Sequence, residues 1–158
     1  NTKTKKMYML KGNLIILIVI FIFSQISFSL REEKFLSLKK SKVNVRYGPS
    51  LESPIKFIYK KIDLPIKQID KKENWRRIID SKNNSGWIHW SQLKPINSVI
   101  SLKNKILFKK PTKFSKPLAN IQQGRLLIIK KCDGSWCKVQ TEKYKGWTDN
   151  KNLWGKIN

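Results

Sequence analysis

An internal repeat limits how this chain can fold more than any other feature of its sequence. Residues 74–78 (NWRRI) correspond to residues 135–139 (SWCKV), and residues 86–88 (GWI) correspond to residues 146–148 (GWT). Three further matches keep the same order: Pro49 with Pro111, Pro54-Ile55 with Pro117-Leu118, and Leu93 with Leu153. The offset drifts only between 60 and 63 residues. The repeat therefore predicts two copies of one small structural unit.

Both copies have the pattern of β-structure. Residues 43–47 (VNVRY) alternate with a period of two, and the turn-forming residues 48–50 (GPS) follow them. No stretch after residue 35 has a helical period of useful length. Further strands are expected at residues 56–60, 62–69, 75–79, 87–89, 99–102, 105–108, 125–131, 136–141 and 145–148. Short strands with turns at this density predict an all-β fold, with a small barrel or sandwich in each copy.

The repeat sets the expected domain boundaries. The first unit is predicted at residues 35–94 and the second at residues 98–156. The link between them is short, so we expect the two units to touch. Each unit has about 60 residues, which is near the lower limit for a self-sufficient core. The two units are therefore expected to stabilise each other.

The N-terminus has the residue order of a secretory signal peptide. Lysines precede ten uncharged apolar residues at 14–23 (LIILIVIFIF), and small residues up to Ser29 come before a charged cluster. We expect an apolar signal helix within residues 1–29 that is cleaved after Ser29. The alternative is an uncleaved anchor, although a membrane span needs about 20 apolar residues and this run is shorter. Either way, the basic N-terminus favours export of the remaining chain to the periplasm.

The chain is strongly basic, with 34 Lys and Arg against 10 Asp and Glu and a formal net charge of +24. Such a balance favours an anionic partner, which could be a nucleic acid, a membrane surface or an acidic polymer. An amino-acid usage rich in Lys, Ile and Asn, together with solvated lysine faces, would give the same balance. Export argues against a nucleic-acid partner, and contact with a membrane is expected only through an uncleaved N-terminal segment.

The first copy carries a set of motifs that resembles a known family. Residues 43–50 (VNVRYGPS), 54–55 (PI), 74–78 (NWRRI) and 86–89 (GWIH) are similar to the bacterial SH3 domains of exported proteobacterial proteins. The resemblance extends over residues 35–156, with a second copy that is more degenerate. It implies two tandem SH3-like β-barrels behind a signal peptide. It also implies a module that targets the cell envelope or peptidoglycan.

The two cysteines are expected to form a structural disulfide. Cys132 and Cys137 flank four residues, so a hairpin would place them opposite each other on adjacent strands. An exported protein meets an oxidising compartment. A zinc site is disfavoured because such sites need four ligands and no histidine lies nearby. A redox role is disfavoured because the spacing is not Cys-x-x-Cys.

The sequence offers no recognisable catalytic, metal or cofactor site. His89 is the only histidine, and it is interpreted as a structural or surface residue because both cysteines lie in the other unit. No spacing among the ten carboxylates suggests the pair that a glycosidase holds across its cleft. The chain is therefore not expected to be an enzyme.

The aromatic residues divide into two groups. Four tryptophans recur in the repeat and are interpreted as core and strand-end packing residues of the barrels: Trp75, Trp87, Trp136 and Trp147. Trp90 has no tryptophan counterpart in the second copy. With Tyr47 and Tyr59 it forms the candidate ligand-binding face, where sugar or peptide groups could stack on the rings.

These observations favour a non-enzymatic exported binding module that recognises peptidoglycan or an envelope peptide or protein. The alternative is a structural or accessory subunit that binds an envelope protein through one barrel edge.

Overall fold

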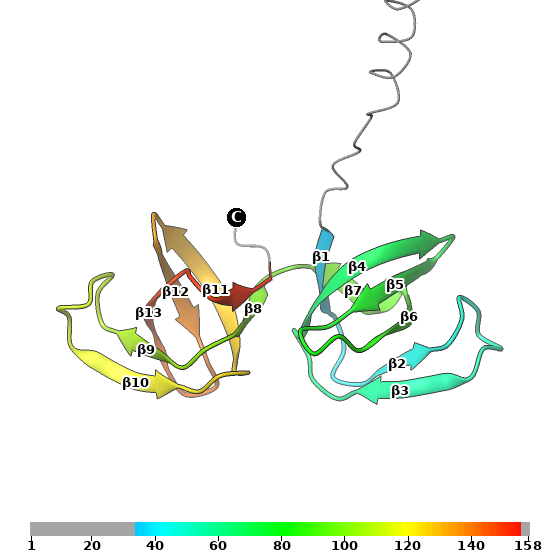
Figure 1. Cartoon of the computed structure of the whole chain (residues 1–158), viewed down its shortest axis with the longest axis horizontal. Coiled ribbons are helices and arrows are strands. Elements are labelled where there is room, and N and C mark those ends of the chain that lie inside the picture. The colour runs from blue at the N-terminus through cyan, green and yellow to red at the C-terminus, as the bar shows by residue number, and fades with distance from the viewer. Residues whose placement is uncertain (1–33, 156–158) are drawn as a thin grey trace, which may run out of the picture. The chain divides into compact units, whose positions relative to one another are not determined.

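The computed structural model describes residues 34–155, so the signal peptide or anchor expected at residues 1–29 lies outside the described part. The described chain forms two seven-stranded antiparallel sheets (Figure 1). The first contains β1 (Lys34–Leu38), β2 (Val43–Arg46), β3 (Ile55–Tyr59), β4 (Pro65–Lys72), β5 (Trp75–Ile79), β6 (Ser85–His89) and β7 (Leu93–Pro95), with a short 3-10 helix, η1 (Trp90–Gln92), before β7. The second contains β8 (Ser98–Ser101), β9 (Lys105–Phe108), β10 (Pro117–Ile121), β11 (Leu126–Asp133), β12 (Trp136–Gln140), β13 (Lys145–Asp149) and β14 (Leu153–Trp154). No helix within residues 34–155 is long and apolar enough to cross a membrane.

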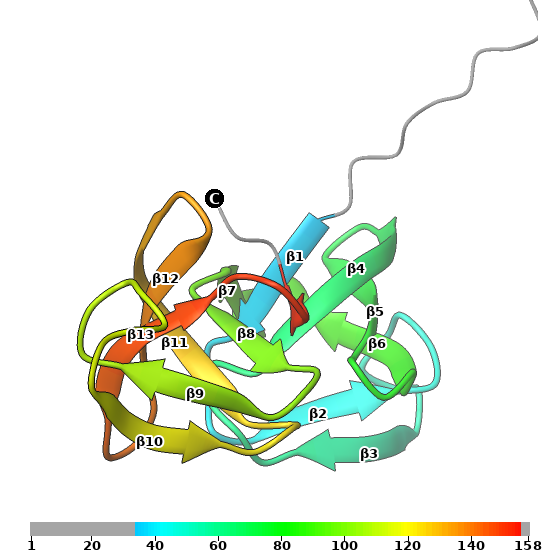
Figure 2. The ribbon, with the colours of Figure 1, turned by 60° about the vertical axis from the view of Figure 1, so that its left-hand side comes forward.

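The two sheets share one strand order. The order is β3-β2-β6-β5-β4-β1-β7 in the first and β10-β9-β13-β12-β11-β8-β14 in the second, so each strand recurs seven strands later. Each sheet curls into its own small barrel (Figure 2). Backbone contacts recur too: the amide of Trp90 donates to the carbonyl of Asn74 at 2.8 Å, and that of Asn150 donates to Ser135 at 2.9 Å. The predicted all-β fold with two tandem barrels is confirmed.

The same local devices shape both barrels. A two-residue turn joins β4 to β5 and β11 to β12, and its first residue has a positive φ in both copies, 47° at Glu73 and 53° at Gly134. The register of the same hairpin shifts between Gln68 and Asp70, and again between Ile129 and Lys131. Such bulges bend a strand and increase its twist. They allow the eight-residue strands β4 and β11 to curve around their barrels.

Each barrel has its own aliphatic core. Alternation along the strands points one face inward, as in β2, where Val43 and Val45 are buried and the residues between and after them are not. The first core contains Leu38, Val43, Val45, Ile66, Ile78 and Ile88. The second contains Val99, Leu107, Ile121, Leu127, Cys137 and Val139.

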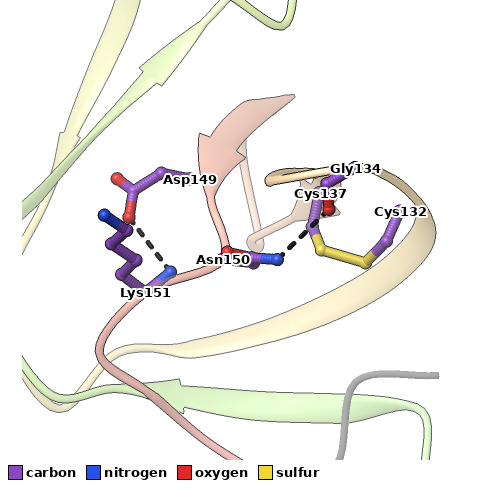
Figure 3. The surroundings of a disulfide bond; sticks show 6 residues. All are labelled: Cys132, Gly134, Cys137, Asp149, Asn150 and Lys151. Carbon is purple, nitrogen blue, oxygen red and sulfur yellow. Dashed lines mark hydrogen bonds between the residues drawn. A yellow bond between two sulfur atoms is a disulfide. The ribbon is translucent and has the colours of Figure 1, made fainter.

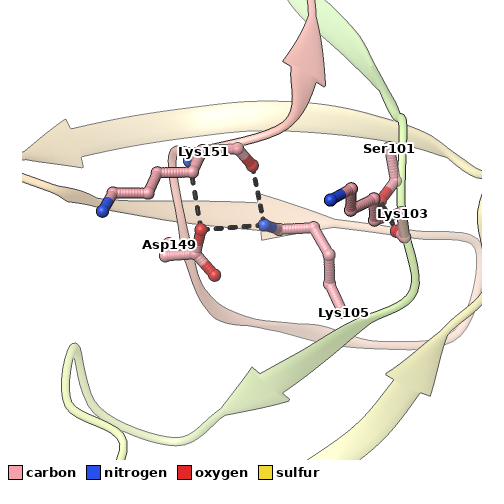
Figure 4. A network of polar contacts seen from close by, with 5 residues as sticks. All are labelled: Ser101, Lys103, Lys105, Asp149 and Lys151. Carbon is pink, nitrogen blue, oxygen red and sulfur yellow. Dashed lines mark hydrogen bonds and ion pairs between the residues drawn. The ribbon is translucent and has the colours of Figure 1, made fainter.

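A buried lysine distinguishes the second barrel from the first. Lys105 begins β9 at the repeat position of Val43, and only 4% of its side chain is exposed. Its ammonium donates to Asp149 Oδ1 at 2.9 Å and to the carbonyl of Lys151 at 2.8 Å (Figure 4). A buried charge needs such partners, because an unpaired one would carry a large desolvation cost.

The expected disulfide is present in the second barrel. Cys132 and Cys137 lie directly opposite each other on β11 and β12, and their sulfurs are bonded at 2.00 Å (Figure 3). The bridge closes the hairpin whose turn carries Gly134, and the Asn150 side-chain amide donates to the Gly134 carbonyl at 3.2 Å. The corresponding pair in the first barrel is Lys71 and Arg76, so the fold does not depend on the bridge.

Several elements differ from the expected strands. β5 and β9 have the predicted bounds, whereas β1, β7, β10 and β14 were not predicted. β7 and β14 have three and two residues and are too short to show a period. β10 begins at Pro117, a residue that reads as a strand breaker but is tolerated here at the first position of an edge strand.

The two barrels are in direct contact. The ring of Phe35 on β1 meets the ring of Trp154 on β14 edge to face, with centroids 5.1 Å apart. The hydroxyls of Ser37 and Ser98 lie 3.1 Å apart and are fully buried. The Ser98 hydroxyl also donates to the carbonyl of Asp63 at 2.5 Å. Contacts between the units were expected from the short link.

Candidate functional site

The three aromatic residues of the candidate ligand-binding face occupy different environments. Tyr47 is 64% exposed and Trp90 is 54% exposed. Arg46 on β2 lies opposite Trp87 on β6, so in the antiparallel register Tyr47 lies beside Gly86, which is four residues and about 13 Å from Trp90. The Lys56 ammonium lies over the Tyr47 ring, 5.6 Å from its centroid. Tyr47 and Trp90 are therefore two separate surface aromatics.

Tyr59 makes a structural contact, and its ring is not an exposed surface for a ligand. It is half-buried against the first core, and its hydroxyl donates to Asp80 Oδ2 at 3.0 Å. The Asp80 carboxylate also accepts hydrogen bonds from the amides of Lys82 and Asn84, at 2.8 and 2.9 Å. Burial, and then the negative charge of Asp80, raises the pKa of the Tyr59 hydroxyl. Tyr59 thus ties β3 to the turn that joins β5 to β6.

The repeated tryptophans pack outside the two aliphatic clusters. Trp75 and Trp147 are buried, while Trp87 and Trp136 are half-buried. Trp87 and Trp147 each follow a buried glycine, and a Cβ added to Gly86 would lie 2.4 Å from a Val45 methyl carbon. The barrel walls therefore approach closely at the glycine, and the adjacent tryptophan points to the other face.

His89 contributes to packing in the first barrel. Its ring meets the ring of Trp75 edge to face at 5.4 Å, and its Nδ1 lies 2.8 Å from the Ser91 hydroxyl. Among residues 34–155 no group of three or more histidine, cysteine or acidic side chains is arranged to hold a metal ion.

A cleft opens where the two barrels meet, and we call it the junction cleft. Its volume is 420 Å³, within the range of about 300–1,000 Å³ that is typical of ligand sites. Lys60 and Lys61 reach it from the segment after β3, and Arg125 reaches it from the turn before β11. The remaining lining residues are Ser41, Ile62, Asp63, Leu126, Ile128, Gln140, Thr141 and Glu142.

The lining combines charge with apolar surface. The three cations are all exposed, and Ile62 is 49% exposed beside them. Of the two acids, Asp63 is already paired with Lys94 of β7. A ligand with an anionic group and a short apolar part would match both features.

A second hollow of 270 Å³ adjoins the junction cleft on the second barrel. Arg125, Thr141 and Glu142 line both spaces. The second hollow adds Lys143 and Tyr144 from the turn before β13. Arg125 therefore lies between two adjoining spaces that together could hold an extended ligand.

None of the residues proposed from the sequence for ligand binding lines the junction cleft. The Lys60-Lys61 pair and Arg125 each stand at a strand boundary, a position that carries no distinctive motif. They come together only because the two barrels dock on each other. A search for charged residues at corresponding loops of the two copies could have identified them, but not their proximity.

A match to a family model agrees with the two-barrel architecture. A family model described as the bacterial SH3 domain matches the chain twice, at residues 39–95 and 103–155. No curated protein matches the chain. Among solved structures the chain is similar to NlpC2 and NlpC1 from Trichomonas vaginalis, each with 12% sequence identity and a TM-score of 0.37. The matches cover 81% and 82% of this chain but 50% and 48% of those chains, so the chain spans about half their length.

Proposed function

The chain belongs to the bacterial SH3 domain family, and we propose that it is a non-enzymatic binding protein of the cell envelope whose ligand occupies the junction cleft. The ligand is an anionic component of the envelope, with peptidoglycan as the first candidate. The observation that carries the proposal is a cleft to which both barrels contribute cations, Lys60 and Lys61 from one and Arg125 from the other.

Electrostatics supports an anionic ligand at two ranges. The chain carries a formal net charge of +24, which attracts polyanions over distances up to the Debye length, about 8–10 Å at physiological salt. Inside the cleft, the Arg125 guanidinium can bind a carboxylate through two parallel hydrogen bonds. The apolar side chains of Ile62 and Leu126 add a surface for the uncharged part of the ligand.

Export supports an envelope location for this binding. The basic N-terminus, the apolar run at residues 14–23 and the small residues up to Ser29 have the order of a signal peptide. We propose that residues 34–155 work in the periplasm, either released or held at the inner membrane by an uncleaved anchor. Fractionation of cells, with the mature N-terminus determined by sequencing, would test this location.

The test of the proposed site is a pull-down with purified peptidoglycan over a series of salt concentrations. We expect wild-type protein to bind at low salt and to release as salt rises. The Arg125→Glu variant should bind at least tenfold more weakly, because it replaces the cation that lines both hollows with a second carboxylate beside Glu142, which also lines both. Lys82→Glu is the matched control, since Lys82 is exposed in the first barrel and does not line either hollow.

Equal losses for Arg125→Glu and Lys82→Glu would mean that net charge alone controls binding and that the cleft is not the site. No binding at low salt would reject peptidoglycan as the ligand. Cross-linking in whole cells would then show whether a single envelope protein is bound instead. Alanine variants of Tyr47 and Trp90 test the exposed aromatics separately, and normal binding by both would exclude them from the site.

A further inference from the structure

The loop between β9 and β10 carries an aromatic side chain that is entirely in solvent. We call residues 109–116 (KKPTKFSK) the lysine loop. Phe114 in this loop is 100% exposed. Burial of a phenylalanine side chain is strongly favourable, so a ring that is wholly in water would gain free energy from contact with an apolar partner.

The shape of the lysine loop does not depend on the Phe114 ring. The Lys109 amide donates to the Lys116 carbonyl at 3.0 Å, and the Lys110 amide donates to the Ser115 hydroxyl at 2.9 Å. The Ser115 amide closes an inner turn by donating to the Thr112 carbonyl at 3.2 Å. Backbone and hydroxyl groups hold the loop, and the ring is left free for another partner.

The charge around Phe114 has one sign. Lys109, Lys110, Lys113 and Lys116 are all exposed. The loop contains no acidic residue, and neither does the whole stretch from residue 81 to residue 132. The fully exposed ring is therefore flanked by four lysines, and no acidic residue lies near it in the sequence.

The first barrel provides an internal comparison. Its corresponding loop, residues 47–54 (YGPSLESP), is closed by the same kind of bond, from the Tyr47 amide to the Pro54 carbonyl at 3.1 Å. Leu51 in this loop is 70% exposed. However, the loop has no lysine and contains Glu52. The combination of an apolar tip with clustered cations thus belongs to the second barrel alone.

We propose that the lysine loop docks on the surface of a bilayer that contains anionic phospholipid, with Phe114 entering the interface between headgroups and acyl chains. Clustered lysines are attracted to an anionic lipid surface, and an aromatic side chain among them can bury its ring at that interface. A single-stranded nucleic acid could also engage the lysines and stack a base on the ring, but the proposed export of the chain argues against such a partner. The proposal is independent of the junction cleft.

The test uses residues 33–158, whose described part, residues 34–155, belongs to one compact unit with both cores. This portion leaves out the apolar run at residues 14–23, which would itself enter a bilayer. Co-sedimentation is measured with vesicles of pure phosphatidylcholine and with vesicles that contain phosphatidylglycerol. We expect binding only to the anionic vesicles, with a loss as salt rises. Phe114→Ser should weaken that binding roughly tenfold.

Leu51→Ser is the matched control, because it removes an exposed apolar side chain from the loop without lysines and should leave vesicle binding unchanged. Lys113→Glu should weaken binding without any change in the apolar surface. Equal vesicle binding by wild type and Phe114→Ser, or no binding of wild type to anionic vesicles at low salt, would overturn the proposal. Peptidoglycan pull-down of Phe114→Ser separates the two proposals, since this variant should retain normal peptidoglycan binding.

Discussion

The turn between β4 and β5 and its counterpart between β11 and β12 share a left-handed backbone position that carries different residues in the two copies. Glu73 and Gly134 occupy the same position, with φ of 47° and 53°. A residue with a Cβ is disfavoured in this left-handed region by about 1 kcal/mol. A Cβ added to Gly134 would meet no atom within 4 Å. A substitution of Gly134 would therefore change stability only through the backbone conformation and not through a side-chain clash.

We predict that Glu73→Gly raises the free energy of unfolding by about 0.5–1 kcal/mol and that Gly134→Ala lowers it by a similar amount. Urea denaturation followed by tryptophan fluorescence measures both changes. Glu73→Gln controls for the lost charge and should change stability little. Effects of the same sign in the two copies would contradict the assignment of strain to this turn position.

Side-chain pairs between residues far apart in the chain could not be predicted from the sequence. Tyr47 and Trp90 are exposed, as stacking on a ligand requires, and their role in binding stays a prediction. The role of Tyr59 was not accessible, because its partner Asp80 lies 21 positions away and is brought close only by the folded barrel. The buried state of Lys105 was equally hidden, since its pairing with Asp149 joins positions 44 apart.

At the scale of elements, the hairpin of β11 and β12 differs from its counterpart by one covalent bond. The Cys132–Cys137 bridge closes a very short loop, for which chain entropy predicts a stabilisation of about 2 kcal/mol. We predict that reduction lowers the free energy of unfolding by that amount and leaves the protein folded. Circular dichroism and urea denaturation with and without reductant measure this.

Cys132→Ala is the control for the bridge, because it removes the bond and keeps the buried sulfur of Cys137 in the second core. Its stability should equal that of the reduced wild type and should not respond to reductant. A loss of the β-sheet signal in either sample would show that the second barrel cannot fold without its bridge, unlike the first.

The elements themselves were the most predictable part of the fold. The strand at Trp75–Ile79 could be predicted with its bounds because turn residues stand on both sides of it. Strands β7 and β14 could not, because each pairs through only two or three residues with β1 or β8. The contacts that order them come from the neighbouring strand and not from their own sequence pattern.

At the scale of the whole molecule, the junction between the barrels is where the repeat symmetry ends. Phe35 and Trp154 have Ser98 and Lys94 as their counterparts, so the ring contact occurs once and not twice. The junction cleft likewise combines the end of β3 from one copy with the start of β11 from the other. Its lining could not be predicted from either copy alone, because it depends on how the two dock.

This docking should couple the stabilities of the two barrels. We predict a coupling energy of about 0.5–1.5 kcal/mol between Phe35→Ala and Trp154→Ala in a double-mutant cycle, because edge-to-face rings contribute beyond their buried area. Phe57 and Trp154 provide the control cycle, since Phe57 packs against Tyr59 inside the first barrel. In calorimetry, we expect the wild-type protein to show one unfolding transition and the double variant to show two, because each barrel has about 60 residues and its own core. Additive effects of Phe35→Ala and Trp154→Ala, within about 0.3 kcal/mol, would mean that this ring contact does not couple the two barrels and does not hold the junction cleft.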